Sequence, residues 1–188
     1  MTNPPRAHRA RGKGTLSFYL VTVSTSRFAK MKEGSQYADE SGDMAELRIS
    51  EESHRVLGRK LISDDRRMIR SAVRGFLRSK GDVLLLVGGT GVSPRDVTVE
   101  SVAPFFDKEL VGFGELLRSI SFGRIGSAAM LTRATAGTAR GKLIVCLPGS
   151  PDAVDTALKN FLSEFPHVIA VAREGGPMKH GGVRSNRK

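Results

Sequence analysis

Residues 82–98, DVLLLVGGTGVSPRDVT, decide the fold. Apart from Asp82, the first six residues are apolar, and such an uninterrupted run predicts a central strand of a parallel sheet, which is buried on both faces. The glycines that follow predict a turn at the carboxyl end of this strand. Thr98 is placed to cap a helix that continues through Phe106. The stretch therefore predicts one strand-loop-helix unit of an α/β sheet.

Short apolar runs alternate with amphipathic stretches from Thr15 onward, which is typical of a mostly parallel sheet covered by helices. The expected strands are 18–23, 56–62, 82–87 and 142–147. The expected helices are 43–49, 65–79, 98–106, a short one that starts at 115 after a glycine-rich break at 112–114, and 151–162. We expect a polar loop between the first strand and the first helix, through residue 42.

The loop 88–96 is the first candidate site, because ligands of an open parallel sheet bind beyond the carboxyl ends of its strands. Its glycines allow close approach to a ligand, Thr90 and Ser93 add hydroxyl groups, and the following helix offers unpaired amides to an anion. The loop matches neither the Walker A sequence nor the dinucleotide fingerprint. Composition alone leaves a phosphate-binding loop and an ordinary tight turn as open alternatives.

Two aspartates, Asp96 and Asp64, stand near expected helix starts. Beside a phosphate-binding loop, Asp96 could coordinate a magnesium ion that bridges phosphate oxygens. Alternatively, it opens the helix, interacts with the helix dipole and pairs with Arg95. Asp64 poses the same choice between a first-turn acid and the second acidic member of a site.

The stretch 147–152, LPGSPD, is a second strand-to-helix junction. Ser150 is a candidate N-cap, and Pro151 suits the first helical position. Two helix N-termini that meet at one crevice would suit a ligand with several phosphates, whereas a single one more often reflects simple capping.

The composition narrows the class of protein. The chain has 188 residues, enough for one domain with tails. Cys146 is the only cysteine, which excludes an intrachain disulfide, and its apolar surroundings predict a small buried side chain. The four histidines lack the spacing of a zinc site. No apolar run reaches the roughly 18 residues of a membrane span, and no secretory signal is evident, so we expect a cytoplasmic protein.

The net charge of +11 is unevenly distributed. The tails 1–14 and 173–188 together carry +8, and the stretch 15–172 between them carries +3. We predict that the tails are disordered and that 15–172 is the folded domain. The tails have no interleaved aromatic residues, so we do not expect nucleic-acid binding.

Several motifs, in matching order, resemble the MogA/MoaB family of molybdenum-cofactor biosynthesis proteins. They are STSR at 24–27, DESG at 39–42, the glycine loop with its RDVT ending at 88–98, GFGE at 112–115 and LPGSP at 147–151. The resemblance extends from about residue 16 to residue 173, and residues 105–115 favour the MoaB branch.

This resemblance implies a three-layer αβα domain that binds molybdopterin and transfers AMP from Mg-ATP to its terminal phosphate, releasing pyrophosphate. Asp96 and Asp64 match the family's catalytic acids and are candidate ligands of Mg²⁺. The residues expected to bind substrate or nucleotide are Gly88, Gly89, Thr90, Gly91, Ser93, Arg95, Ser24, Ser26, Gly149 and Ser150.

The resemblance also carries an alternative. Some MoaB proteins are thought to have lost the activity, with a change in the Arg-Asp pair after the loop. Arg95 and Asp96 are both intact here, which favours an active enzyme over a non-catalytic molybdopterin carrier or assembly protein. The implied partners are molybdopterin, ATP and a downstream metal-insertion protein, and the implied assembly is a homo-trimer or homo-hexamer.

Overall fold

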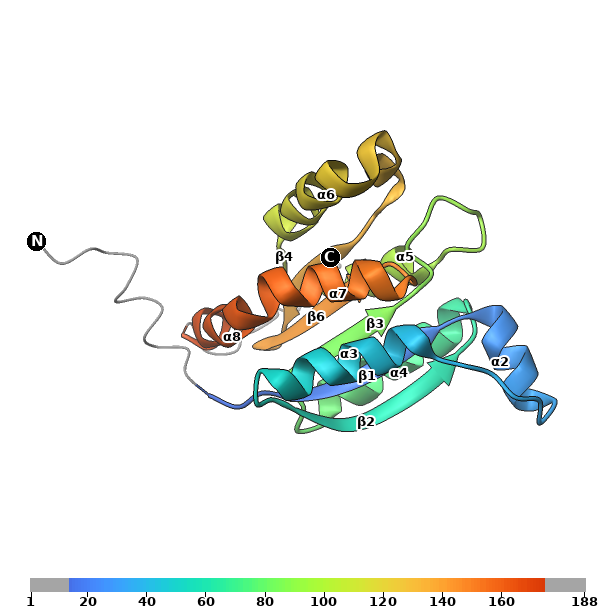
Figure 1. The fold of residues 1–188 in the computed structure, drawn as a ribbon. Helices are drawn as coiled ribbons and strands as arrows, with labels where there is room; N and C mark the ends of the chain where they lie inside the picture. The colour runs from blue at the N-terminus through green and yellow to red at the C-terminus, as the bar shows by residue number, and fades with distance from the viewer. Residues whose placement is uncertain (1–13, 175–188) are drawn as a thin grey trace, which may run out of the picture.

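A computed structural model describes residues 14–174 (Figure 1). The predicted disordered tails lie outside these residues, except for Gly14, Arg173 and Glu174, and Arg173 is the last residue of a helix. The strands are β1 (Ser17–Val23), β2 (Arg55–Ile62), β3 (Val83–Val87), β4 (Lys108–Glu109), β5 (Thr135–Ala139) and β6 (Lys142–Leu147). The α-helices are α2 (Thr25–Lys32), α3 (Glu40–Glu51), α4 (Arg66–Arg78), α5 (Thr98–Val102), α6 (Val111–Ile125), α7 (Pro151–Phe161) and α8 (Phe165–Arg173). The 3₁₀ helices are η2 (Ala103–Phe105), η3 (Gly126–Leu131) and η4 (Leu162–Glu164).

Within these residues the strands form one six-stranded sheet in the order β2-β1-β3-β6-β5-β4. The pairs from β2 to β6 are parallel, and β5 and β4 add antiparallel pairs at the other edge. All five residues of β3 are buried, as the uninterrupted apolar run predicts. Cys146 is fully buried in β6, opposite Leu86, and burial raises the pKa of its thiol. The mostly parallel sheet is confirmed.

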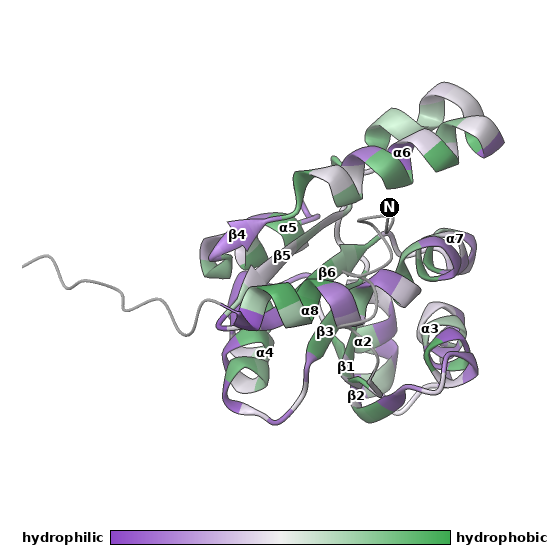
Figure 2. Cartoon of the chain, turned by 90° about the vertical axis from the view of Figure 1, so that its left-hand side faces the viewer, coloured by the Kyte–Doolittle hydropathy of each residue, from purple (hydrophilic) through white to green (hydrophobic). Residues whose placement is uncertain are grey.

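Helices cover both faces of the sheet and make a three-layer αβα sandwich, which confirms the predicted fold class (Figure 1). One core contains apolar side chains of α3, α6, α7 and α8, such as Ile49 and Leu158. The other contains those of α4 and α5, such as Val73 and Val102. Colouring by hydropathy shows the apolar strands between these layers (Figure 2). No helix within 14–174 is long and apolar enough to cross a bilayer.

The structure corrects the start of the predicted loop 24–42. This segment opens with α2, for which Ser24 is the N-cap and accepts a hydrogen bond from the Arg27 amide. None of the α2 residues is buried, so the helix has no apolar stripe that its sequence could reveal. Helix α3 begins at Glu40, three residues before the predicted start, because Asp39 caps it and accepts from the Gly42 amide.

Two other predicted boundaries are wrong. The glycine-rich break at 112–114 lies inside α6, where a Cβ on Gly114 would lie 2.6 Å from the carbonyl oxygen of Ala134. Glycine is therefore needed there for close packing and does not end the helix. Thr98 does not cap α5 either. It is the first helical residue, and its hydroxyl donates to the carbonyl of Gly88 at 2.9 Å.

Candidate functional site

A cavity of about 770 Å³ lies beyond the carboxyl ends of the parallel strands, where the loops after β1, β2, β3 and β6 meet. The sequence predicted its position, because open parallel sheets bind ligands at this edge. Every site residue predicted from the sequence lines this cavity. They are Ser24, Ser26, Asp64, Gly88, Gly89, Thr90, Gly91, Ser93, Arg95, Asp96, Gly149 and Ser150.

The glycine loop owes its shape to left-handed backbone and close packing. Gly88 has φ +109°, and a Cβ there would collide with the carbonyl oxygen of Val23. Gly89 has φ +64°, and its Cβ would lie 2.6 Å from Oδ1 of Asp64. The amide of Gly88 donates to the carbonyl of Leu147 at 2.9 Å. The loop is thus held between the ends of β1 and β6, at positions that only glycine can occupy without strain.

Thr98 closes the loop from its other end. Its buried hydroxyl donates to Gly88, and its amide donates to the carbonyl of Gly89 at 3.0 Å. These bonds occupy the carbonyls of two successive glycines of the loop. The motif residue expected to cap a helix therefore fixes the conformation of the loop instead.

Asp64 faces the cavity and does not open α4. Asp65 is the N-cap of α4, and its carboxylate accepts from the Met68 amide at 2.8 Å. Oδ2 of Asp64 accepts from both the amide and the hydroxyl of Thr25, at 2.9 and 3.0 Å. Its Oδ1 lies against Gly89. Of the two alternatives, the structure supports a carboxylate at the site over a first-turn acid.

Asp96 also belongs to the loop and does not cap α5. Its Oδ2 accepts from the Ser93 amide at 3.1 Å and lies 2.8 Å from the position of a Cβ on Gly91. The N-cap of α5 is Val97, without a side-chain hydrogen bond. Asp64 thus lies beside Gly89 and Asp96 beside Gly91, and both line the same cavity.

The N-termini of α2 and α7 reach this cavity. Ser24 caps α2, and Ser150 caps α7 by accepting from the Ala153 amide at 3.3 Å. Both N-cap residues line the cavity, so each caps a helix and also lies at the candidate site. Helix α2 was not expected, and with it the cavity gains Thr25 and Arg27.

Arg133 supports the loop from outside and was missed from the sequence. Its Nε donates to the carbonyl of Gly91 at 2.9 Å, and its Nη2 donates to that of Asp96 at 3.4 Å. Its Nη1 forms an ion pair with Glu100, and this hydrogen bond holds the pKa of Glu100 below its ordinary value. No motif marks Arg133, because its partners lie more than thirty residues away in the chain.

Residues 39–42 do not line the cavity, but they hold the elements that surround it. Ser41 is fully buried, and its hydroxyl donates to the carbonyl of Gly149 at 2.7 Å. Asp39 accepts from the hydroxyl of Thr22 at 2.7 Å and from Nη2 of Arg59 at 2.6 Å. The start of α3 is therefore tied to β1, β2 and the loop after β6.

The Asp39 carboxylate should make stability depend on pH. Burial alone would raise its pKa, but the hydrogen bonds from Arg59 and Thr22 and the charge of Arg59 hold that pKa below its ordinary value. A lowered folded-state pKa contributes stability above the unfolded value of about 4, and this contribution is lost as pH falls through the folded value.

Asp39→Asn should therefore be less stable than wild type at pH 7, and the difference should shrink as pH falls below about 4. Urea unfolding of both proteins at several pH values measures this difference. A gap that stays constant down to the acid transition would contradict the role assigned to the Asp39 charge.

The carboxylates fit a magnesium ion that arrives with a phosphate ligand. Mg²⁺ is usually held by one or two carboxylates together with substrate phosphates and water, and Asp64 and Asp96 line one cavity beside a phosphate-compatible loop. Within residues 14–174, no group of three or more His, Cys, Asp or Glu side chains forms a protein-only metal site. The donor set thus suits a shared magnesium ion.

The fold and the cavity define an α/β domain with a glycine loop, paired carboxylates and helix N-termini at the carboxyl edge of its sheet. Residues 19–167 match the family model described as "Probable molybdopterin binding domain". The chain belongs to this family, which confirms the resemblance seen in the sequence.

Relatives match over nearly their whole lengths. Molybdenum cofactor biosynthesis protein B of Bacillus cereus is 38% identical over 164 residues, covering 86% of this chain and 93% of the relative. Molybdopterin adenylyltransferase of Pyrococcus furiosus is 37% identical over 171 residues, covering 89% and 97%.

Solved structures agree with these matches. The tungsten cofactor synthesizing protein MoaB from Pyrococcus furiosus superposes with a TM-score of 0.76 at 37% identity, covering 86% of this chain and 99% of that one. A MogA structure superposes with a TM-score of 0.71 at 24% identity, covering 83% and 99%, and it supports the fold alone.

Proposed function

We propose that this protein is a molybdopterin adenylyltransferase, which transfers AMP from ATP to the terminal phosphate of molybdopterin. The observation that carries the proposal is the cavity, where the glycine loop, Asp64, Asp96 and two helix N-termini meet. The Pyrococcus relative named molybdopterin adenylyltransferase supports it.

In this reaction, an oxygen of the pterin phosphate attacks the α-phosphorus of ATP. The new P–O bond forms as the bond to the β-phosphate breaks, and pyrophosphate leaves with the electron pair. The attacking phosphate is already ionised near neutral pH, because its second pKa is about 6, so no side-chain nucleophile or strong base is needed. The chain's main task is to hold two repelling anions in line.

Side chains and amides at the cavity are suited to this task. The positive dipole ends of α2 and α7 and the glycine loop lie at the cavity and can attract phosphate oxygens. Arg27 and Arg95 line the cavity and add positive charge. Asp64 and Asp96 would hold the Mg²⁺, which neutralises phosphate charge and polarises the α-phosphorus when bound.

A second candidate function is a molybdopterin-binding carrier that does not consume ATP. It is favoured by relatives whose names, such as molybdenum cofactor biosynthesis protein B, state no activity. The two functions separate in one experiment, in which the protein is incubated with molybdopterin, ATP and Mg²⁺. Pyrophosphate released in proportion to pterin supports the enzyme. Tight pterin binding without pyrophosphate supports the carrier.

We also propose that the protein forms homo-oligomers through the apolar surface of α6 and η3. Figure 2 shows α6 projecting from the rest of the fold. More than half of each of these apolar side chains is exposed: Val111, Leu116, Phe122, Ile125, Met130 and Leu131. Large apolar side chains exposed in such number on one projecting segment are typical of an interface. Leu131 also lines the cavity, so assembly through this surface would reach the site.

Changing both Phe122 and Ile125 to Asp should therefore lower the mass of the assembly. Light scattering after size-exclusion chromatography measures this mass. Leu47→Asp, on the half-exposed Leu47 of α3, is the matched control and should leave the mass unchanged. A wild-type monomer, or an unchanged mass in the double variant, would refute the assigned interface.

A further inference from the structure

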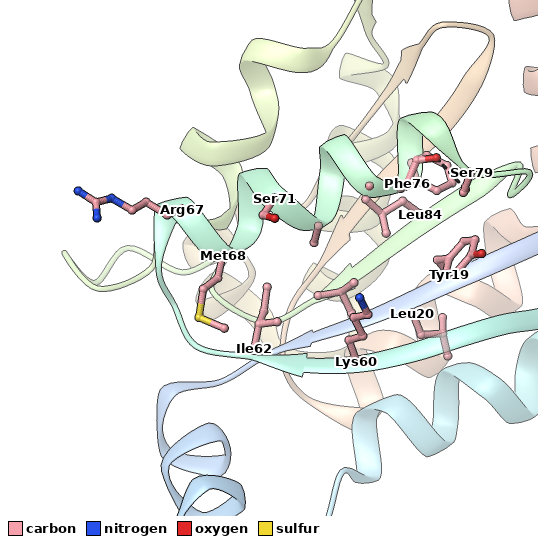
Figure 3. A pocket seen from close by; sticks show the side chains of 13 residues that line it. Tyr19, Leu20, Lys60, Ile62, Arg67, Met68, Ser71, Phe76, Ser79 and Leu84 are labelled. Carbon is pink, nitrogen blue, oxygen red and sulfur yellow. Dashed lines mark hydrogen bonds between the residues drawn. The ribbon is translucent and has the colours of Figure 1, made fainter.

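A groove of about 670 Å³ runs between β2 and α4, on the face of the sheet opposite α3, α7 and α8 (Figure 3). Helix α4 packs on the sheet through its buried side chains Ile69, Val73 and Phe76. Beside it, β2 is the edge strand, and its α4-facing side lies open along the groove. The groove shares no lining residue with the candidate active site.

The floor of the groove is apolar, and its rim is basic. Val21, Ile62 and Met68 belong to the lining, and Figure 3 shows Ile62 and Met68 facing each other across the space between β2 and α4. Lys60 lies at the β2 side of the groove, and Arg67 extends outward at the start of α4 (Figure 3). A groove of this kind can accept apolar side chains below and negative charge above.

Helix α4 concentrates positive charge to an unusual degree. Its arginines, with the lysine that follows, are Arg66, Arg67, Arg70, Arg74, Arg78 and Lys80, and residues 66–81 contain no acid. Among residues 14–174, no carboxylate lies within ion-pair distance of these arginines. Arginines four residues apart repel each other and weaken an isolated helix, so the pattern is not explained by the stability of α4.

Two of these arginines flank the groove. Arg67 lines it, and Arg78 follows eleven residues later, about three helical turns on, so it lies on the same flank of α4. Arg74 turns to the other side, where its guanidinium lies 5.7 Å from the ring centre of Phe105. Lys60 therefore lines the groove on the strand side and Arg67 on the helix side, and Arg78 lies further along the same flank of α4.

We propose that this groove docks an extended acidic segment of a partner protein. The segment would pair with the edge of β2. On the face of the segment that points to α4, apolar side chains would enter between β2 and α4, and carboxylates at other positions of that same face would meet Lys60 and Arg67. Edge strands bind extended peptides in this way, with main-chain bonds for affinity and alternating side chains for specificity.

Two other occupants fit less well. Two copies related by a two-fold axis through the groove would bring the same basic side chains together. Single-stranded nucleic acid needs exposed aromatic surfaces for base stacking, whereas Phe76 is only 3% exposed and the Tyr19 ring packs against it edge-on.

Gly75 allows the groove to be blocked without damage to the fold. A Cβ at this position of α4 meets nothing within 4 Å, and Gly75 lines the groove. Gly75→Leu should therefore fill the groove, and it should not destabilise the helix, because leucine has the higher helix propensity. Val171→Leu is the control, since Val171 is an exposed residue of α8, on the other face of the sheet.

The probe is a fluorescent peptide in which Val and Glu alternate at every second position, with Thr between them, so that one face of the extended peptide carries both. Its binding to the full-length protein is measured by anisotropy at several salt concentrations. We expect binding that weakens with salt, a loss of at least about tenfold in Gly75→Leu, and a similar loss in Lys60→Glu combined with Arg67→Glu. Val171→Leu should bind as wild type does. Lys108→Glu combined with Lys159→Glu, at sites away from the groove, changes the net charge by the same amount and is the control for charge.

Several results would overturn the proposal. They are failure of the wild type to bind the peptide, equal binding by Gly75→Leu, tighter binding of oligothymidine than of the peptide at the groove, and a change of oligomeric mass in Gly75→Leu. Because the groove and the candidate active site share no lining residue, adenylylation by Gly75→Leu should equal that of wild type. Failure of the docking proposal is thus distinct from failure of the enzymatic one.

Discussion

Asp96→Asn is expected to lower the rate of molybdopterin adenylylation by at least about a hundredfold, the scale seen when one electrostatic group is removed from an active site. The asparagine Oδ1 can still accept from the Ser93 amide, so the loop should keep its shape. The lost element is the negative charge that would hold Mg²⁺ beside the phosphates. The effect should therefore fall on kcat, and molybdopterin binding without metal should change little.

The rate is measured as pyrophosphate released per enzyme at saturating pterin and ATP. Glu52→Gln, which neutralises an exposed carboxylate at the C-terminal end of α3, is the control and should keep the wild-type rate. An Asp96→Asn enzyme with near wild-type kcat would remove Asp96 from the catalytic groups.

Gly88→Ala is expected to lower the free energy of unfolding by about 3 kcal/mol or more, because a strained backbone and a steric collision act together. The residue has φ +109°, and an added Cβ would collide with the carbonyl oxygen of Val23. Neither group can move easily. Val23 is the last residue of β1, and the Gly88 amide is bonded to Leu147 at the end of β6.

Urea unfolding of Gly88→Ala measures this loss. Gly75→Ala is the matched control, because Gly75 lies inside α4 with no atom near its Cβ, and it should gain about 0.5–1 kcal/mol. Any folded Gly88→Ala protein should also bind molybdopterin more weakly, since the loop must shift. Wild-type stability in Gly88→Ala would contradict this prediction, because it would show that the end of β1 can shift to accommodate the added Cβ.

The parts of the fold that the sequence predicts are those with strong local signals. Strand β3 is recognisable because it is buried on both faces, and α7 because Ser150 and Pro151 mark its start. Strand β5, by contrast, reads TAGTA. Its residues are small, and their burial depends on the neighbouring strands, so no large apolar side chain marks the strand in the sequence. Gly137 is required because a Cβ would collide with the ring of Phe106.

The same distinction holds at the site. The glycine loop and Asp96 lie within nine consecutive residues, and Asp64 lies directly before a predicted helix. Each follows a predicted parallel strand, so the sequence alone puts them at the same edge of the sheet. Arg133 reaches Gly91 and Glu100 only in the folded chain. Helix α2 brings Thr25 against Asp64, although the two are 39 residues apart. Contacts of this kind depend on tertiary packing, which single-sequence periodicity does not encode.

The positive charge of the folded domain is concentrated on one helix. The stretch between the tails carries only +3, yet α4 and Lys80 contribute six positive charges to it, without an acid among them. Acidic residues elsewhere, such as Asp39, Asp43 and Glu46 around Arg59, offset them. A nearly balanced domain therefore has a locally basic helix.

The most direct test of the proposed function follows the phosphorus that is attacked. The protein is incubated with molybdopterin, Mg²⁺ and ATP labelled on either its α- or its γ-phosphate, and the pterin is then isolated. We expect the α-label to appear on the pterin and the γ-label to leave as pyrophosphate. Pterin without α-label, or with γ-label instead, would contradict adenylyl transfer at this cavity.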